Sequence, residues 1–209
     1  MTTITNVGDT NRSFAKRGKS KQFATEQAQT VRAATYDLLR SLKLTTFFGN
    51  PGSTELTFLK NFPSDFQYIL GLQEATALAM ADGFAQATRR PALVNLHTGA
   101  GVGNGMCSIL TAFLNKTPLI ITAGQQTREM IICDPYLTNR DETMLPRPWV
   151  KWAYQPTRAQ DVPRAIMRAY AMALRPPSGP VFVSIPLDDW DRPSLGPRRR
   201  PHGQHPLRT

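Results

Sequence analysis

The hydrophobic residues follow two patterns that take turns along the chain. In one, apolar residues recur every three or four positions, which is typical of a helix with one buried face. In the other, apolar residues form short runs between glycine, proline or polar breaks, which is typical of a strand buried on both sides. The first pattern predicts helices over residues 30–42, 56–62, 75–88, 106–114 and 161–174. The second predicts strands over residues 45–48, 66–72, 92–96, 118–123 and 180–185.

Helices and strands thus alternate over most of the chain, and this order favours parallel strands joined by crossover helices. We therefore predict an α/β fold, a three-layer, doubly wound, mostly parallel sheet with helices on both faces. Residues 125–156 are the least regular stretch and contain Trp149, Trp152 and Tyr154. Their pattern allows either a subunit contact or an excursion packed over the sheet.

Both ends of the chain differ in composition from the middle. Residues 1–28 are polar and basic, and residues 191–209 are rich in Arg and Pro without apolar periodicity. Because such segments bury little apolar surface, we expect both to be disordered, which leaves residues 29–190 as one domain. An organelle transit peptide is an alternative for the first segment, but Asp9 and Glu26 argue against it.

The net charge of +10 raises the question of a nucleic-acid partner. Residues 1–30 contribute +3 and residues 191–209 contribute +4, which leaves only +3 for the 160 residues between them. Because the middle of the sequence shows no basic helix face or aromatic RNA-binding signature, we expect no nucleic-acid function.

Cysteine usage and hydropathy bear on the location of the protein. Cys107 and Cys133 form no Cys-x-x-Cys motif, which makes a disulfide framework or a zinc site an unattractive interpretation. No apolar run reaches the roughly 18 residues that a membrane helix needs. We therefore expect a soluble cytoplasmic protein with no membrane contact.

Candidate chemistry gathers where predicted strands end. Glu74 follows the strand at 66–72, and His97 follows the strand at 92–96. A glycine-rich turn is expected at 99–105. Because ligands of parallel sheets bind beyond the carboxyl ends of strands, these residues should face one crevice. Each also has a structural explanation, since a glutamate suits the first turn of a helix and a strand-end histidine is often simply hydrogen-bonded.

Two further motifs are ambiguous when taken singly. The segment G-N-P-G-S at 49–53 breaks a strand and exposes backbone groups, and its Ser53 suits either a helix cap or a ligand contact. The segment G-A-G-V-G-N-G at 99–105 fits neither G-x-G-x-x-G nor a Walker loop, because Asn104 and Met106 stand where the third glycine would be. A nucleotide-binding domain is therefore a weak alternative.

Taken together, six segments are more specific, and they resemble one known domain in order and spacing. The chain over about residues 31–191 resembles the N-terminal, pyrimidine-binding domain of thiamine-diphosphate-dependent 2-oxo acid decarboxylases. Benzoylformate decarboxylases are the nearest likeness, and acetolactate synthases are further away. The segments are G-N-P-G-S at 49–53, L-Q-E-A at 72–75, A-D-G-F-A-Q-A-T at 81–88, N-L-H-T-G-A-G-V-G-N at 95–104, P-L-I-I-T-A-G-Q-Q at 118–126 and G-P-V-F-V-S-I-P-L-D-D-W at 179–190.

The resemblance implies roles for particular residues. Glu74 would hydrogen-bond N1′ of the aminopyrimidine ring of thiamine diphosphate, His97 would relay protons, and Ser53 would contact the substrate carboxylate. The backbone at Asn50, Pro51 and Gly52 would line the pyrimidine. The implied catalytic residues are therefore Glu74, His97 and Ser53, and the implied substrate is a 2-oxo acid.

The chain also departs from that family. The family's Gly-Asp-Gly motif, which helps to hold Mg²⁺ on the diphosphate, does not occur here. Mg²⁺ ligands are therefore expected in a missing C-terminal domain, and no metal ligand is assigned in this chain. We expect the chain to be incomplete and inactive alone, either as a truncated product or as one half of a split enzyme. A non-catalytic subunit that pairs with a separate chain is the alternative. The complete enzyme is expected to be a homo-oligomer, a tetramer in the family.

Overall fold

The computed structural model describes residues 29–194, and its centre is a six-stranded sheet in which every strand pairing is parallel. The strand order is β2-β1-β3-β4-β6-β5. The expected mostly parallel α/β sheet is thus confirmed. The strands are β1 (Thr46–Gly49), β2 (Gln67–Leu70), β3 (Ala92–Leu96), β4 (Leu119–Gln125), β5 (Ala153–Tyr154) and β6 (Val181–Pro186).

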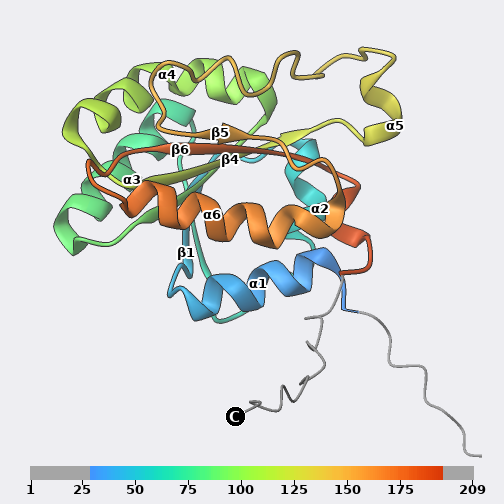
Figure 1. Ribbon diagram of the computed structural model, residues 1–209, viewed down its shortest axis with the longest axis horizontal. Coiled ribbons are helices and arrows are strands. Elements are labelled where there is room, and N and C mark those ends of the chain that lie inside the picture. The colour runs from blue at the N-terminus through green and yellow to red at the C-terminus, as the bar shows by residue number, and fades with distance from the viewer. Residues whose placement is uncertain (1–28, 195–209) are drawn as a thin grey trace, which may run out of the picture.

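Helices cover both faces of this sheet, as Figure 1 shows. Helices α1 and α6 pack on each other against one face, and α3 and α4 pack on each other against the opposite face. The helices are α1 (Val31–Ser41), α2 (Leu56–Leu59), α3 (Glu74–Thr88), α4 (Thr98–Asn115), α5 (Arg128–Ile131) and α6 (Val162–Leu174). Three short 3₁₀ helices lie at Ser53–Glu55, Ala159–Asp161 and Asp189–Asp191.

The continuous apolar runs of the central strands are explained by this layering. Every residue of β3, β4 and β6 is buried, because both faces of these strands are covered. Successive side chains point to opposite faces, so Leu93 and Ile120 join the core beneath α1 and α6, whereas Val94 and Ile121 join the core beneath α3 and α4.

Two expectations about local structure were wrong. The segment 99–105 is not a turn, because α4 begins at Thr98 and all four of its glycines lie in the first two turns of that helix. The expected helix over 56–62 is also shorter, because α2 ends at Leu59. The stretch 125–156 is the least regular, as expected, since after the end of β4 it contains only the four-residue α5 and the two-residue β5, which pairs with β6 at one edge of the sheet.

The first and last described residues lie next to each other. The N–H of Val31 donates to the carbonyl of Arg192 at 2.9 Å, and the N–H of Ser194 donates to the carbonyl of Gln29 at 2.7 Å. Residues 191–194, which were assigned to a disordered tail, are therefore hydrogen-bonded to the start of the domain. The remainder of the two expected disordered ends, 1–28 and 195–209, lies outside the described residues.

An ion pair ties α5 to the segment that follows β6. The guanidinium of Arg128 donates to both carboxylate oxygens of Asp189, at 2.7 and 2.8 Å, and also to the carbonyl of Pro156 at 2.6 Å. The Asp189 side chain is only 1% exposed. Burial raises the pKa of Asp189 above its usual range, although the hydrogen bonds from Arg128 act in the opposite direction.

Candidate functional site

The candidate residues meet at the carboxyl edge of β1 and its two neighbours. The parallel register places Gly49 of β1 beside Leu70 of β2 and Asn95 of β3, so these three strands end at the same level. Residues 50–55, Glu74 and His97 follow those strand ends. Residues from three separate segments therefore come together at this edge of the sheet.

Glu74 is a nearly buried carboxylate held by two side-chain amides. It is 7% exposed and is the first residue of α3, where a negative charge is favoured by the helix dipole. Asn50 donates to one carboxylate oxygen and Asn104 to the other, each at 3.2 Å. A side chain at Gly101 would begin 3.3 Å from the Glu74 carboxylate, so the absence of one lets α4 approach Glu74 closely.

His97 lies between β3 and α4 and faces a second carboxylate. Its Nδ1 is 2.9 Å from Oε2 of Glu55 and 3.2 Å from the hydroxyl of Thr54. A carboxylate can only accept, so in a neutral imidazole this contact assigns the proton to Nδ1 and leaves Nε2 as the acceptor. A Cβ at Gly52 would lie 2.2 Å from Nδ1, so Gly52 is required where the loop crosses the imidazole ring.

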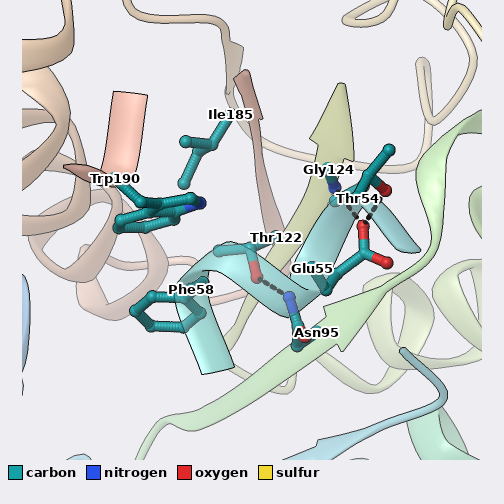
Figure 2. Close-up of a pocket in the computed structure, with 9 residues that line it drawn as sticks. Thr54, Glu55, Phe58, Asn95, Thr122, Gly124, Ile185 and Trp190 are labelled. Carbon is teal, nitrogen blue, oxygen red and sulfur yellow. Dashed lines mark hydrogen bonds between the residues drawn. The ribbon is translucent and has the colours of Figure 1, made fainter. Parts of the chain in front are cut away.

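Glu55 is a site residue that sequence reasoning missed. Its side chain is 1% exposed, and besides His97 it accepts hydrogen bonds from the N–H of Gly52 at 2.7 Å, the N–H of Gly124 at 2.9 Å and the hydroxyl of Thr54 at 2.6 Å. Figure 2 shows the Thr54 and Gly124 bonds meeting at one carboxylate oxygen. The available signal was its place three residues after Gly52, which is the spacing of a capping-box glutamate.

The structure separates Ser53 from this hydrogen-bonded group. Gly52, not Ser53, is the N-cap of the 3₁₀ helix at Ser53–Glu55, so the capping alternative for Ser53 does not hold. Ser53 is exposed, and its hydroxyl makes no hydrogen bond to another residue in the range 29–194. Pro51 and Gly52 are half-buried beside it. Asn50, Gly52, Glu74 and His97 thus come together, and Ser53 lies at their exposed side.

A buried polar network supports the strands below the site. Asn95 donates to the hydroxyl of Thr122 at 3.1 Å, and Thr122 donates to the carbonyl of Val94 at 3.0 Å. The hydroxyl of Tyr68 is 3.4 Å from the side-chain oxygen of Asn95. Burial raises the pKa of Tyr68, and the nearby charge of Glu55 adds to the rise, so the phenol remains a donor near neutral pH.

Comparison with known proteins places this chain in a family. Residues 29–140 match the family described as "Thiamine pyrophosphate enzyme, N-terminal TPP binding domain". The chain belongs to this family. Thiamine pyrophosphate and thiamine diphosphate are names for the same cofactor.

Individual relatives narrow the comparison. A benzoylformate decarboxylase of Pseudomonas aeruginosa is 55% identical over 166 residues, which is 79% of this chain and 31% of that protein. An X-ray structure from Mycobacterium smegmatis, assigned to a thiamin diphosphate-dependent enzyme, is 69% identical with a TM-score of 0.81, over 81% of this chain and 33% of that one. The benzoylformate decarboxylase of Polynucleobacter necessarius is 61% identical with a TM-score of 0.79, over 80% and 32%. The chain spans about a third of the length of these relatives.

The residues present fit the cofactor's aminopyrimidine ring but not its metal ion. A nearly buried carboxylate with both oxygens oriented by amides can hydrogen-bond a ring nitrogen, and the loop at 50–52 offers half-buried backbone beside it. Residues 29–194 contain no group of three or more His, Cys, Asp or Glu side chains that could hold a metal ion. They also contain no helix long and apolar enough to cross a membrane.

Proposed function

We propose that this chain forms the pyrimidine-binding part of a thiamine-diphosphate-dependent 2-oxo acid decarboxylase of the benzoylformate decarboxylase type. The observation that carries the proposal is the Glu74 carboxylate, which is nearly buried at the end of the sheet and oriented by Asn50 and Asn104. The identity to benzoylformate decarboxylases, over four fifths of this chain, supports the substrate class.

Each site residue has a distinct task in this proposal. Bound thiamine diphosphate supplies the carbon nucleophile and the electron sink that decarboxylation needs. Glu74 would hydrogen-bond the pyrimidine nitrogen N1′, and the backbone of Asn50, Pro51 and Gly52 would line the ring. Burial of Glu74 excludes water from this contact, which strengthens the hydrogen bond.

His97 is proposed to transfer protons to and from the reacting part of the substrate through Nε2. Glu55 is a positioning residue, because its bond to Nδ1 fixes both the tautomer and the direction of the ring. Ser53 is proposed to contact the substrate carboxylate, and its exposure at the open side of the site supports this role.

A chimera tests the proposal directly. Residues 29–192 of this chain replace the matching segment of the P. aeruginosa benzoylformate decarboxylase, and the release of benzaldehyde and carbon dioxide from benzoylformate is measured. We expect an active chimera that loses about 10²- to 10⁴-fold in kcat on Glu74→Gln, the usual range for a lost proton-transfer group.

Glu129→Gln serves as the matched control, because Glu129 is an exposed glutamate on α5. It should leave kcat within about twofold. A folded chimera without activity, or one in which Glu74→Gln and Glu129→Gln are equally active, would refute the catalytic role of this domain.

We also propose that the outer face of α3 and α4 joins a second copy of the chain. Exposed positions of both helices carry no charge, although the chain as a whole is strongly basic. These residues are Thr76, Ala79, Gly83, Gln86, Ala87 and Thr88 of α3, and Ala100, Gly103, Asn104, Cys107, Thr111, Leu114 and Asn115 of α4. Two molecules of net charge +10 would repel each other least through such a face.

Two glycines on this face support the same proposal. Gly83 and Gly103 lie inside helices, where glycine costs about 0.5–1 kcal/mol relative to alanine, and no atom lies within 4 Å of the Cβ that either lacks. Packing within residues 29–194 therefore gives no reason for them, whereas close approach of a second helix pair would.

Sedimentation velocity would test this contact. We expect the unmodified chain to sediment as a dimer and Gly83→Arg to sediment as a monomer. Ala171→Arg, on the exposed side of α6, is the control and should remain dimeric. An unmodified chain that is monomeric at about 50 μM, well above the Kd of a stable dimer, would refute the proposal.

Two further assignments complete the proposal. Mg²⁺ would accompany the diphosphate and be held by residues outside 29–194, since the residues in this range do not form a metal site. A cytoplasmic location is supported by Cys107 and Cys133, which are exposed free thiols of the kind that a reducing compartment preserves.

A further inference from the structure

Trp190, which belongs to the D-D-W segment after β6, has no task in the chemistry proposed above. Its side chain is nevertheless 4% exposed, and its ring stacks on Phe58 with centroids 4.1 Å apart and planes 22° apart. Phe58 lies on α2, three residues after Glu55. Trp190 is thereby held beneath the loop that carries the carboxylate partner of His97.

A small cavity lies between Trp190 and Glu55, and Figure 2 shows the side chains around it. Its volume is about 10 Å³, which is about the smallest space that can hold one water molecule. One part of its wall is apolar and the other part is polar. The apolar part includes Phe58, Ile185 and Trp190, and the polar part includes Glu55, Asn95 and Thr122.

The indole N–H of Trp190 is a donor that needs an acceptor. It makes no hydrogen bond to any residue between 29 and 194, and in Figure 2 the nitrogen lies on the edge of the ring that faces the cavity. The nitrogen is not among the fully buried side-chain atoms of residues 29–194 that lack a partner, so a water molecule can reach it. Tryptophan N–H groups of buried side chains usually bond to the protein or to an ordered water molecule. The position of this nitrogen therefore indicates an acceptor inside the cavity.

The opposite wall offers further hydrogen-bonding capacity. The hydroxyl of Thr122 donates to the carbonyl of Val94 and accepts one bond from Asn95, which leaves one lone pair of its oxygen free. The Asn95 amide keeps a second N–H. By contrast, the two oxygens of Glu55 already take part in four contacts, so Glu55 bounds the cavity without needing a new partner.

These features select one kind of ligand. The occupant must accept from Trp190, which excludes a bare cation, and a ligand that can also donate uses the free lone pair of Thr122. An anion is further disfavoured by the adjacent carboxylate of Glu55, and the volume excludes organic molecules. We propose that the cavity is a binding site for a single water molecule that bridges the Trp190 indole and the Thr122 hydroxyl.

This water would join the C-terminal D-D-W segment to the network beneath the catalytic residues. It connects Trp190 to β4 through Thr122, and to β3 through Asn95. His97 directly follows β3. The NMR signal of the Trp190 indole N–H would then report on the hydrogen bonds below Glu55.

Proton NMR of the ¹⁵N-tryptophan-labelled 209-residue chain tests the site. The chain contains three tryptophans, so three indole N–H signals are expected, and Trp190→Phe identifies one of them by its loss. In rotating-frame and laboratory-frame cross-relaxation spectra, we expect the Trp190 indole proton to show a contact to water with the sign of a long-lived bound molecule. Trp152, which is half-buried and stacks on Tyr154, is the comparison in the same spectrum.

Removing the opposite partner provides the second measurement. Thr122→Val keeps the shape of the side chain but deletes its hydroxyl, and we expect at least a fivefold loss of the water contact at Trp190 with no change at Trp152. A Trp190 signal without a long-lived water contact in the unmodified chain would overturn the proposal. So would a crystal structure in which the indole N–H meets a protein acceptor.

Discussion

Replacing Arg128 with methionine should destabilise the fold in a pH-dependent way. The substitution removes the two hydrogen bonds to Asp189 and the one to Pro156, but it keeps the length of the side chain. Asp189 has a side chain that is 1% exposed, so its charge would remain buried without its bidentate partner. Breaking a buried pair in this way costs about 3–5 kcal/mol.

The lower end of that range applies, because 32% of the Arg128 side chain is exposed and the pair is partly screened by water. A loss of about 3 kcal/mol corresponds to a fall in Tm of about 6–12 °C for a domain of this size. The double variant Arg128→Met, Asp189→Asn removes both charges and should recover most of the loss.

The direction of the pH dependence follows from Asp189. Burial raises its folded-state pKa above the unfolded value, so its stability contribution is complete below the unfolded pKa and is lost as pH rises through the folded pKa. Removing Arg128 raises the folded pKa further. The loss of unfolding free energy in Arg128→Met should therefore be largest near neutral pH. It should shrink as pH falls toward about 4, which is close to the unfolded pKa of Asp.

Urea unfolding of the native chain and both variants, followed by circular dichroism from about pH 4.5 to pH 7.5, measures these differences. The range begins near the unfolded pKa of Asp and extends well above it. If Arg128→Met lowers the free energy of unfolding by less than about 1 kcal/mol, which is the contribution of an ordinary surface ion pair, the pair with Asp189 does not behave as a buried one. A deficit of equal size at both ends of the pH range would refute the role of Asp189.

Three further substitutions test other contacts. Gly124→Ala would place a Cβ 2.2 Å from Oε1 of Glu55, and the forced shift should lower the unfolding free energy by about 1–3 kcal/mol in urea titrations. Gly83→Ala meets no atom of residues 29–194 and, at a dilution at which the chain is monomeric, should raise the free energy of unfolding by about 0.5–1 kcal/mol. Arg158 lowers the pKa of Asp161, so the Asp161 carboxylate stabilises the fold above its unfolded pKa, and this contribution is lost as pH falls. Asp161→Asn should therefore flatten the acid side of a plot of Tm against pH.

The sheet could be read from the sequence because its strands are buried on both faces. The runs at 92–96 and 180–185 correspond to β3 and β6 with at most one residue of displacement, since no polar face interrupts them. The strand at 66–72 was drawn too long, because β2 is an edge strand with exposed residues at both ends. The two-residue β5 is too short to produce any pattern of its own.

The start of α4 could not be read because glycine usually weakens a helix. In α4, glycine is needed at two positions because side chains from α3 pack closely against the helix there. Gly101 makes room for Glu74, and Gly105 makes room for Leu78 of α3, whose side chain would lie 2.4 Å from an added Cβ. Those neighbours come from distant parts of the chain, so the local sequence carries no record of them.

The candidate site was predicted only as far as its residues end predicted strands. Glu74 and His97 follow strands directly, and their convergence at the carboxyl edge required only the parallel topology. Glu55 sits within a loop, and its importance arises from Gly124, 69 positions away, and from His97. Such a contact between distant residues becomes visible only in three dimensions.

Because Gln29 and Ser194 are adjacent, both ends of the range 29–194 lie at one corner of the domain, as Figure 1 shows. Domains whose termini meet in this way tolerate circular permutation, because a short linker can join the old ends while new ends open in an exposed turn. The turn at 61–65, between α2 and β2, offers such a place, since it is largely solvent-exposed and contains none of the site residues. Evolution could therefore transplant this unit into a longer polypeptide without rearranging the sheet that holds its carboxylates.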